Sequence, residues 1–355
     1  MSFSMNNSFP NIHPNFKLNG QLYSKFVDHS SYKEFVSDKS EVLDFIESWT
    51  NNSPVVALQT SGSTGAPKKI LAEKSAMACS AKKTGERFNL KSGDKALLCL
   101  PLSFIAGKMM VVRALVLGLD LYIAIPNRSP LKNFSKTFAF AAMTPYQLEK
   151  SIECLNKVKC LIIGGSPVGE ALKKKIENNT SGVYETYGMT ETLSHVAIKN
   201  LSLGEKEFVA LPGISFSKNN GFLEINAPFL SKTPIITNDL INLVSTTAFE
   251  WQGRAGLTIN SGGIKLSPEK IEKTLSRYYT VPFIICGLPD EQLGEKVVLV
   301  FENKIPSMPE LVFKKLTPYE RPKGIFALNS FNRRHGKINR KDIQNRVLKK
   351  LHGRN

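Results

Sequence analysis

Short apolar runs alternate with amphipathic segments from residue 55 onward. Apolar runs of four to six residues predict buried strands, and apolar residues three and four positions apart predict helices. Strands are expected at 55–58, 96–100, 121–125 and 160–163, and helices at 73–87, 106–117, 145–155 and 167–177. Buried strands that alternate with helices are typical of an α/β fold with a largely parallel sheet.

The two ends of the chain follow different patterns. Near the N-terminus, apolar residues recur at helical spacing and predict a helix over 40–49. After about residue 205 the helices give way to shorter strand-like pieces, at 222–226, 234–237 and 243–245. We therefore expect a shortened α/β domain at 1–255 and a small α+β domain at 256–355 that acts as a lid.

The composition of the 355-residue chain excludes a disordered protein, a collagen-like fibre and a disulfide-stapled miniprotein. Hydrophobic residues make up 42% and charged residues 22%, which suits about two globular domains. Lys and Arg outnumber Asp and Glu by 47 to 30, a formal charge of +17. Residues 256–355 carry +10 of it, from 19 basic and 9 acidic side chains. This excess indicates polyanionic partners without saying which kind.

The cysteines and the apolar segments indicate the compartment. Five cysteines are scattered without a CxxC pair, which argues for reduced thiols and against a zinc site or disulfide framework. No signal-peptide pattern is visible at the start of the chain. The most apolar stretch, Met109 to Pro126, is interrupted by Arg113, Gly118 and Asp120, so it predicts a buried helix and strand. A cytoplasmic protein without a membrane span is expected.

A loop rich in glycine and hydroxyl groups follows the first predicted strand. It reads Thr60-Ser61-Gly62-Ser63-Thr64-Gly65-Ala66-Pro67-Lys68-Lys69. Free backbone N–H groups and hydroxyls donate to phosphate oxygens, and a lysine neutralises their charge. The Walker A pattern does not fit, because Pro67 stands where a glycine must precede the lysine. On its chemistry alone the loop is either a polyphosphate site or an ordinary turn.

The spacing Ser-Gly-Ser-Thr-Gly-x-Pro-Lys resembles the phosphate loop of the adenylate-forming superfamily, which includes acyl-CoA synthetases, luciferases and peptide-synthetase adenylation domains. Further motifs that resemble those of the superfamily follow in its order, over about residues 53–345. They are Gly164-Gly165-Ser166-Pro167, Tyr187-Gly188-Met189-Thr190-Glu191, Thr237-Asn238-Asp239, the segment Gly253 to Gly263, Gly287-Leu288-Pro289-Asp290 and Arg333 to Arg340. The ordered set identifies the chain as a member of this superfamily.

The resemblance implies a site for ATP. The Gly164–Ser166 turn and the ring of Tyr187 would lie against adenine, and Thr190 would lie near the α-phosphate. Glu191 would bind the Mg²⁺ of MgATP, since this hard cation prefers oxygen ligands. Asp239 would accept both ribose hydroxyls, because two carboxylate oxygens match a vicinal diol.

The resemblance also assigns roles near and beyond the domain boundary. Arg254 would bind the ribose or a phosphate, and Gly256 stands at the hinge position. Gly262 and Gly263 would line the channel for the pantetheine arm of CoA. Lys337 would be the catalytic lysine, whose ammonium stabilises the negative charge that builds up at the α-phosphate.

The superfamily's reaction proceeds in two steps. A carboxylic acid and MgATP give an acyl-AMP and pyrophosphate, and a thiol then displaces AMP. The channel glycines and the complete small domain favour CoA as that thiol. The expected ligands are therefore ATP, Mg²⁺, CoA and a small carboxylic acid, without nucleic acid. The oligomeric state stays open, with a homodimer as one option.

The substrate is suggested by the short region before the phosphate loop and by the segment Leu100 to Lys108. Both are most similar to the o-succinylbenzoate–CoA ligases of menaquinone synthesis. Their segment usually reads Leu-Pro-Leu-Phe-His-x-Ser-Gly, and here Phe104 replaces the gate histidine. An aromatic acid with two carboxylates is the expected substrate.

Such a diacid needs a cation for its second carboxylate, and Lys108 and Arg113 are the candidates. The alternatives for Arg113 are that its head group extends to water or that it pairs with Asp120. His195 follows the Tyr187–Glu191 motif and either lines the acyl pocket or has a structural role.

Three other functions stay open at this stage. The chain could be a CoA ligase for another aryl or short-chain acid, or an adenylate-binding protein without catalytic activity. It could also bind nucleic acid through the basic segment 333–354. Few aromatic residues accompany that segment, and no nucleic-acid-binding signature is present.

Overall fold

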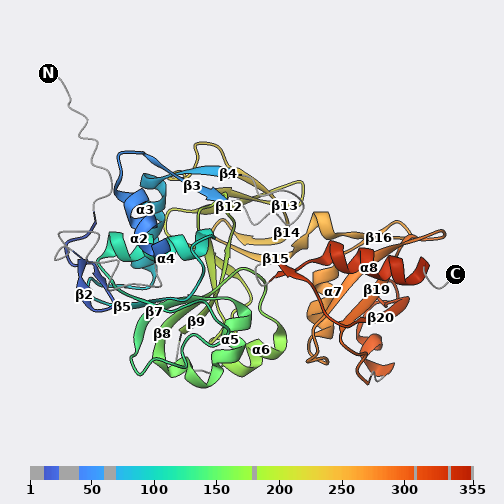
Figure 1. Ribbon diagram of the computed structural model, residues 1–355. Helices are drawn as coiled ribbons and strands as arrows, with labels where there is room; N and C mark the ends of the chain where they lie inside the picture. Colours follow the sequence, from blue (N-terminus) through green and yellow to red (C-terminus); the bar gives the residue numbers. More distant parts are fainter. Residues whose placement is uncertain are drawn as a thin grey trace. The chain divides into compact units, whose positions relative to one another are not determined.

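The computed structural model describes residues 12–23, 40–59, 69–177, 182–307, 310–334 and 337–352 (Figure 1). It divides into two compact units. The first contains the chain up to Pro167 together with Ile176–Ile214 and Ala227–Thr233, and the second contains Val168–Lys175, Ser215–Asn226 and the chain from Pro234 onward. The second unit thus includes strands that precede the predicted domain boundary. The boundary of a moving lid, between residues 255 and 256, stays a prediction.

Parallel strands form the centre of the first unit. In spatial order they are β6 (Asp120–Ile123), β5 (Lys95–Leu98), β7 (Phe138–Met143), β8 (Val158–Ile163) and β9 (Gly182–Gly188). Most residues of β5 to β8 are buried, as expected of parallel strands that are covered on both faces. The predicted α/β fold is confirmed. Strands β7 and β9 had not been predicted.

Helices cover both faces of these strands (Figure 1). On one face, α2 (Ser40–Thr50), α3 (Lys74–Arg87) and α4 (Ile105–Leu117) share a hydrophobic core with alternate residues of the strands. Helix α5 (Pro145–Ser151) lies on the other face, and the 3-10 helix η2 (Ile152–Lys157) continues it. Helix α6 (Glu170–Ile176) follows β8 in the chain.

Further strands extend the sheet of the first unit at both ends, and all but one of them are antiparallel to their neighbours. At one end β10 (His195–Asn200) pairs with β9, and β11 (Phe208–Ala210) pairs with β10. At the other end is the exception, β1 (Lys17–Leu18), which pairs with β6 in parallel, and β2 (Gln21–Leu22) pairs with β1.

The first strand of the alternating sequence pattern lies outside this sheet. Strand β3 (Val55–Gln59) pairs with β4 (Lys69–Glu73) in a separate antiparallel sheet of two strands. The predicted strand at 55–58 therefore exists, but its place in a parallel sheet was wrong. An apolar run indicates that a strand is buried, but it does not indicate which strand pairs with it.

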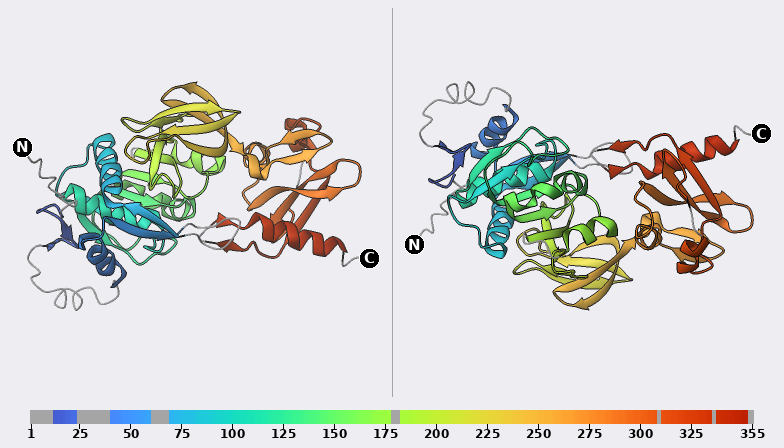
Figure 2. Two further views of the ribbon diagram at one scale, coloured as in Figure 1. Left: turned by 90° about the horizontal axis from the view of Figure 1, so that it is seen from above. Right: turned by 90° about the horizontal axis from the view of Figure 1, so that it is seen from below.

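The second unit begins with a run of antiparallel strands (Figure 2). These are β12 (Ser215–Asn219), β13 (Phe222–Asn226), β14 (Ile235–Ser245) and β15 (Ala248–Arg254). The short strands that the sequence predicts at 234–237 and 243–245 are two parts of β14, which begins one residue later, at Ile235. A break in its register between Leu240 and Ile241 accounts for the interrupted sequence pattern.

The rest of the second unit has the predicted α+β composition. Its elements are η3 (Ala255–Leu257), β16 (Ile259–Ser261), β17 (Ile264–Leu266), α7 (Pro268–Leu275), β18 (Phe283–Asp290), β19 (Gly294–Glu302), η4 (Glu310–Lys315), β20 (Gly324–Leu328), β21 (Arg333–Arg334), β22 (Lys337–Ile338) and α8 (Arg340–His352). Helix α7 packs on one face of the sheet that contains β18 and β19, and α8 packs on the other.

No helix within the described ranges has the length and apolar character that crossing a membrane requires.

Candidate functional site

Two parts of the predicted site are not described by the structure. The phosphate loop, which contains Ser61 to Gly65 and Lys68, lies outside the described residues. For Lys337 only the backbone is described, as part of β22. Their predicted roles stay predictions.

The Tyr187–Glu191 motif lies in the connection between two antiparallel strands. Tyr187 and Gly188 end β9, and β10 begins at His195. The connection is tight: the Met189 N–H donates to Thr192 Oγ1 at 2.9 Å, and the Thr192 N–H donates to the Met189 carbonyl at 3.3 Å. The motif therefore lies in a turn between two strands and not at the start of a helix.

Gly188 has a steric role in this turn. A Cβ atom at this position would lie 2.3 Å from the backbone oxygen of Ser194, well inside van der Waals contact. The sequence therefore brings the end of β9 against the start of β10 in a compact turn, with Tyr187 buried and its ring centroid 5.8 Å from that of Phe208.

Glu191 has an exposed side chain in the same turn. Among the described residues, no group of three or more His, Cys, Asp or Glu side chains could hold a metal ion. Proteins often bind Mg²⁺ through one or two carboxylates and the substrate phosphates, and the exposed Glu191 would supply such a carboxylate. Its role stays a prediction.

The Gly164–Ser166 turn lies beside the Tyr187 motif. It follows β8, which is the parallel neighbour of β9. The Gly164 N–H donates to the Met143 carbonyl at 3.1 Å, and Thr186 Oγ1 donates to the Ile163 carbonyl at 2.9 Å. The structure therefore brings the two predicted adenine-binding segments together at the carboxyl ends of adjacent parallel strands, where open α/β sheets bind ligands.

The predicted ribose-binding residues are direct partners in the second unit. Asp239 of β14 lies opposite Arg254 of β15. Arg254 Nε donates to Asp239 Oδ1 at 2.8 Å, and Nη2 donates to Oδ2 at 3.3 Å. Asp239 is fully buried, whereas the Arg254 side chain is half exposed. This two-point, charge-assisted contact holds the carboxylate in one orientation.

The predicted channel glycines form the turn of the hairpin β16–β17. Gly262 and Gly263 have φ values of 60° and 81°, which is the left-handed backbone of a two-residue type I′ turn. The Gly262 N–H donates to the Leu293 carbonyl at 2.8 Å. Gly256, the predicted hinge residue, lies in the 3-10 helix η3.

Arg113 and His195, two candidates for the acyl pocket, lie together in the first unit. Arg113 is 2% exposed on α4, and His195 is 6% exposed on β10. Arg113 Nη2 donates to Ser194 Oγ at 2.5 Å and lies 3.4 Å from His195 Nδ1. The Arg113 guanidinium also lies over the ring of Phe140, 5.8 Å from its centroid.

This cluster contains buried donors without an acceptor in the part of the chain that the structure describes. Arg113 Nε and His195 Nε2 are both buried and make no hydrogen bond. Because His195 Nδ1 faces an arginine donor, we assign the ring proton to Nε2. A buried donor without a partner costs about 1–3 kcal/mol, so the cluster favours an incoming acceptor.

Burial also changes the protonation of the cluster. Loss of solvent lowers the pKa of Arg113 to about 9. Burial, and to a lesser extent the charge of Arg113, lowers the pKa of His195 well below its usual value. The imidazole is therefore neutral near pH 7. An anion beside Arg113 would favour the charged form of the arginine.

Arg113 makes no ion pair with a carboxylate among the described residues, so its proposed pairing with Asp120 was wrong. Asp120 instead accepts a hydrogen bond from the backbone N–H of Gly20 at 2.8 Å. The guanidinium is buried, so it does not extend to water either.

Lys108, the other candidate cation, points elsewhere. Its ammonium donates to the Ala57 carbonyl at 3.0 Å and lies 5.8 Å from the centroid of the Phe45 ring. Positions 108 and 113 are five residues apart on one helix and thus face different directions. Phe104, at the gate position, immediately precedes α4 and is partly exposed.

Ser194 is a member of the cluster that the sequence had not singled out. It is a small polar residue in a turn, and such residues are common in turns without any functional role. Only the packing of α4 against β10 brings its hydroxyl to Arg113, which is 81 positions earlier in the chain.

Comparison with known proteins agrees with these observations. The family of AMP-binding enzymes matches residues 17–215. The 2-succinylbenzoate–CoA ligase of Oceanobacillus iheyensis is 24% identical, over 89% of this chain and 78% of that protein. The ligase of the same name from Lactococcus lactis is also 24% identical, over 93% and 82%.

Solved structures show the same fold. An acyl-CoA synthetase (AMP-forming)/AMP-acid ligase II-like protein from Dyadobacter fermentans is 34% identical, with a TM-score of 0.58 over 87% of this chain and 94% of that one. The o-succinylbenzoate CoA synthetase from Bacillus subtilis, in complex with ATP and magnesium ion, is 20% identical, with a TM-score of 0.69 over 80% and 68%. The chain therefore belongs to the family of AMP-binding enzymes, and it is an acid–thiol ligase of that family.

Proposed function

We propose that this enzyme activates o-succinylbenzoate as its acyl-adenylate and transfers the acyl group to CoA, as a step of menaquinone biosynthesis. The observation that carries the choice of substrate is the buried Arg113, which has no carboxylate partner among the described residues. The names of the curated relatives support the same choice.

The surroundings of Arg113 suit an aromatic acid with two carboxylates. One carboxylate reacts with ATP, and the other keeps its charge throughout the reaction. That second charge would bind Arg113, with the Ser194 hydroxyl and the neutral His195 ring beside it. Aromatic rings of Phe88 and Phe140 lie next to this cluster, with their centroids 5.7 Å apart. They offer an apolar surface for a benzene ring.

In the first step, the substrate carboxylate would attack the α-phosphorus of ATP and pyrophosphate would leave. The Gly164–Ser166 turn and Tyr187 would hold adenine, Asp239 with Arg254 would hold the ribose, and Glu191 would hold Mg²⁺. Lys337 would stabilise the charge that develops between the carboxylate and the α-phosphate.

In the second step, the thiol of CoA would attack the acyl carbon of the adenylate and release AMP. The Gly262–Gly263 turn has no side chains, which suits close passage of a narrow pantetheine arm. Gly256 would allow the lid to change position between the two steps.

ATP–pyrophosphate exchange with two related acids tests this proposal. One acid is o-succinylbenzoate, and the other is 4-oxo-4-phenylbutanoate, which has the same side chain but lacks the ring carboxylate. We expect the Arg113→Met variant to lose about 100-fold in kcat/KM for the diacid, because truncating one partner of a buried charge pair costs about 2–5 kcal/mol. For the monoacid we expect a change of less than about threefold.

Lys108→Met is the matched control, since it removes a cation from the same helix. Its effect on the two acids is expected to be equal. Exchange with another acid but none with o-succinylbenzoate would refute the proposed substrate. Equal losses for both acids in Arg113→Met would remove the proposed role of this arginine.

A further inference from the structure

The hairpin that carries Lys337 is held at its base, on both of its strands, by arginine–carboxylate pairs. Strand β22 pairs with β21, with Arg333 opposite Ile338 and Arg334 opposite Lys337. The Asn339 N–H donates to the Asn332 carbonyl at 2.9 Å, which closes the base of this short hairpin. Hairpins of two strands are at most marginally stable on their own, so other contacts must hold this one.

The first pair joins the beginning of the hairpin to the central strand β19. Arg333 Nη1 donates to Glu302 Oε1 at 2.7 Å, and Nη2 donates to Oε2 at 2.5 Å. Glu302 Oε1 also accepts the backbone N–H of Phe331 at 2.7 Å. Phe331 is buried, so the chain that enters β21 is fixed through its backbone and through its side chain.

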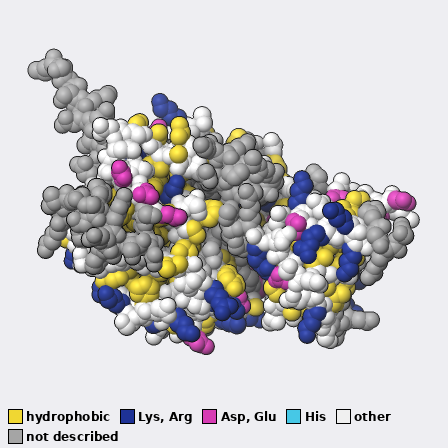
Figure 3. All heavy atoms as spheres, in the orientation of Figure 1, with side chains coloured by type: hydrophobic (Ala, Val, Ile, Leu, Met, Phe, Trp, Pro, Cys, Tyr) yellow, Lys and Arg dark blue, Asp and Glu magenta, His cyan; other side chains and the backbone are white. Residues whose placement is uncertain are grey.

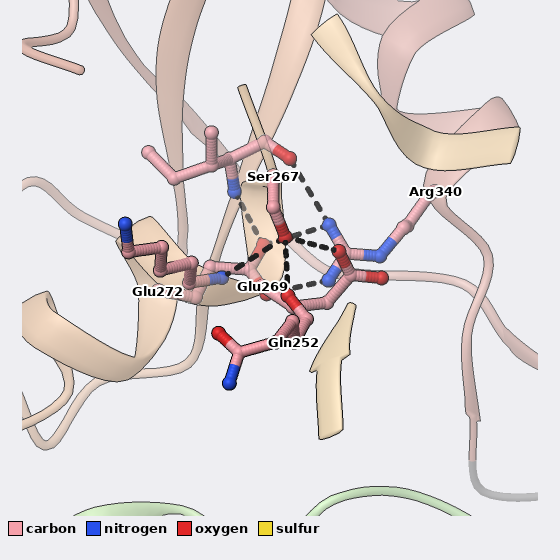
Figure 4. Close-up of polar contacts among 7 residues, drawn as sticks. Gln252, Ser267, Glu269, Glu272 and Arg340 are labelled. Atoms are coloured by element: carbon pink, nitrogen blue, oxygen red, sulfur yellow. Dashed lines mark hydrogen bonds and ion pairs between the residues drawn. The ribbon is translucent and has the colours of Figure 1, made fainter. Parts of the chain in front are cut away.

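The second pair joins the end of the hairpin to helix α7 (Figure 4). Arg340 Nη1 donates to Glu272 Oε1 at 2.7 Å, and Nη2 donates to Oε2 at 2.5 Å. Nη1 also donates to the Ile285 carbonyl at 3.0 Å, and Glu272 Oε1 accepts the Ile285 N–H at 2.6 Å. Arg340 thus contacts both α7 and β18.

A second carboxylate, that of Glu269, faces the same arginine from the first turn of α7 (Figure 4). Burial raises the pKa of Glu269, and the charge of Arg340 opposes this shift. Ser267 Oγ lies 3.3 Å from Glu269 Oε2 and 3.2 Å from the Gln252 carbonyl. Both hydrogen bonds from the Arg340 guanidinium to a carboxylate go to Glu272, so Glu272 and not Glu269 is the primary partner of Arg340.

These two pairs differ from the ordinary ion pair Arg346–Asp342, which lies further along α8, the helix that begins at Arg340. Arg346 and Asp342 lie 3.5 Å apart at a single point, four residues apart on one helix. The hairpin pairs are bidentate and join residues 31 and 68 positions apart in the chain. The Arg340 and Glu272 side chains are 25% and 17% exposed, which limits solvent screening.

We propose that Arg333–Glu302 and Arg340–Glu272 are positioning pairs that hold β22, and with it the backbone of Lys337, on the core of the second unit. The proposal rests on the role of Lys337 in the proposed function. Neither arginine needs to touch the substrate. A displacement of about 1 Å in a catalytic group can cost about 100-fold in rate, so a fixed backbone matters at this position.

Hydrogen–deuterium exchange measures the proposed effect without any substrate. The variants are Arg340→Met and the more conservative Glu272→Gln, and Lys349→Gln, at an exposed position of α8, is the control. We expect amide exchange in a peptide that spans residues 331–340 to become about tenfold faster in the first two variants and to stay unchanged in the control. Unchanged exchange in both test variants would overturn the proposal.

The two half-reactions show whether this fixation serves Lys337. Adenylation is followed by pyrophosphate exchange, and thioester formation is followed from supplied acyl-AMP. We expect Lys337→Ala to abolish only adenylation. Arg340→Met should show the same selectivity, with adenylation about 100-fold slower at unchanged KM for ATP and with thioester formation within about threefold. Arg340→Lys, which keeps the charge, should recover part of the loss.

Equal losses in the two half-reactions would indicate general damage to the fold and would overturn the positioning role. Faster amide exchange without slower adenylation would overturn it as well. If the unmodified enzyme adenylates another acid but not o-succinylbenzoate, the proposed substrate is wrong. The two half-reactions of the variants are then compared with the acid that reacts. If the unmodified enzyme adenylates none, the proposed function fails, and the amide exchange still decides whether the pairs hold the strand.

Discussion

At the scale of single residues, the partners of a buried cation distinguish a structural residue from a candidate binding residue. Lys74 is 1% exposed, and its ammonium donates to the backbone and side-chain oxygens of Asn51. Arg113 is equally buried, but its contacts are a hydroxyl, an imidazole, a thioether and an aromatic ring. Because none of these groups is anionic at neutral pH, a substrate carboxylate is the partner that would complete the site.

His195 should make the stability of the fold depend on pH. Its pKa is lowered in the folded protein by burial and by Arg113, whereas an unfolded histidine titrates near pH 6.5. The unfolded state therefore binds a proton first as the pH falls, and the stabilisation that is present above about pH 6.5 is progressively lost below it. Between pH 6.5 and 5.5 this effect amounts to about 1 kcal/mol.

Urea unfolding at pH 7.5 and pH 5.5 measures this contribution. His195→Gln removes the titrating group. From pH 7.5 to pH 5.5 the free energy of unfolding of this variant should therefore fall by about 1 kcal/mol less than that of the unmodified protein. The same pH dependence in both proteins would show that His195 is not the source.

At the scale of elements, the candidate site depends on how the strands end. The β8–α6 and β9–β10 connections lie at the carboxyl ends of adjacent parallel strands, and they carry the two predicted adenine-binding segments. The sequence predicted the strand at 160–163 and the motif at 187–191. It did not predict β9, because the consecutive polar residues Glu185 and Thr186 interrupt Gly182–Gly188, which then shows neither a continuous apolar run nor a regular alternation.

Gly188→Ala tests the close approach in the β9–β10 turn. The new Cβ would lie 2.3 Å from a backbone oxygen, which cannot move aside as a flexible side chain can. We expect the free energy of unfolding to fall by about 2 kcal/mol, a typical cost of overpacking, and the midpoint of urea unfolding measures it.

Gly169→Ala is the control, since no heavy atom lies within 4 Å of the Cβ at that position. Its stability should change by less than about 0.5 kcal/mol. Similar losses in both variants would show that the close contact is not the cause.

At the scale of the whole molecule, the net charge of +17 remains to be connected with function. On the face shown in Figure 3, lysine and arginine side chains are scattered among neutral and acidic ones and do not form one continuous patch. The described residues of this face therefore form no basic stripe or patch of the kind that nucleic-acid binding requires. The scattered charge suits a general attraction for small anions such as ATP and CoA.

The salt dependence of thioester formation tests this interpretation. Raising KCl from about 50 to about 300 mM shortens the Debye length, so kcat/KM for CoA should fall several-fold. N-acetylcysteamine, a thiol acceptor without phosphates, is the control and should show less than a twofold change. Equal salt dependence for both acceptors would argue against electrostatic attraction of CoA.

Local patterns and ordered motifs in the sequence were sufficient for the fold class, for most of the helices and for the class of reaction. Apolar periodicity reports which face of an element is buried, and motif spacing reports chemistry within a few residues. Neither reports which elements are neighbours. For this reason the place of β3, in a sheet separate from the parallel strands, could not be predicted.

Only the tertiary structure decided which residues meet. It brought Arg113 to Ser194 and His195 while directing Lys108 to the Ala57 carbonyl, and it joined Arg340 to Glu272 across 68 positions of the chain. Such contacts depend on strand register and on the packing of helices against strands. They are set by the sum of many weak interactions over the whole fold, which no local segment of sequence contains.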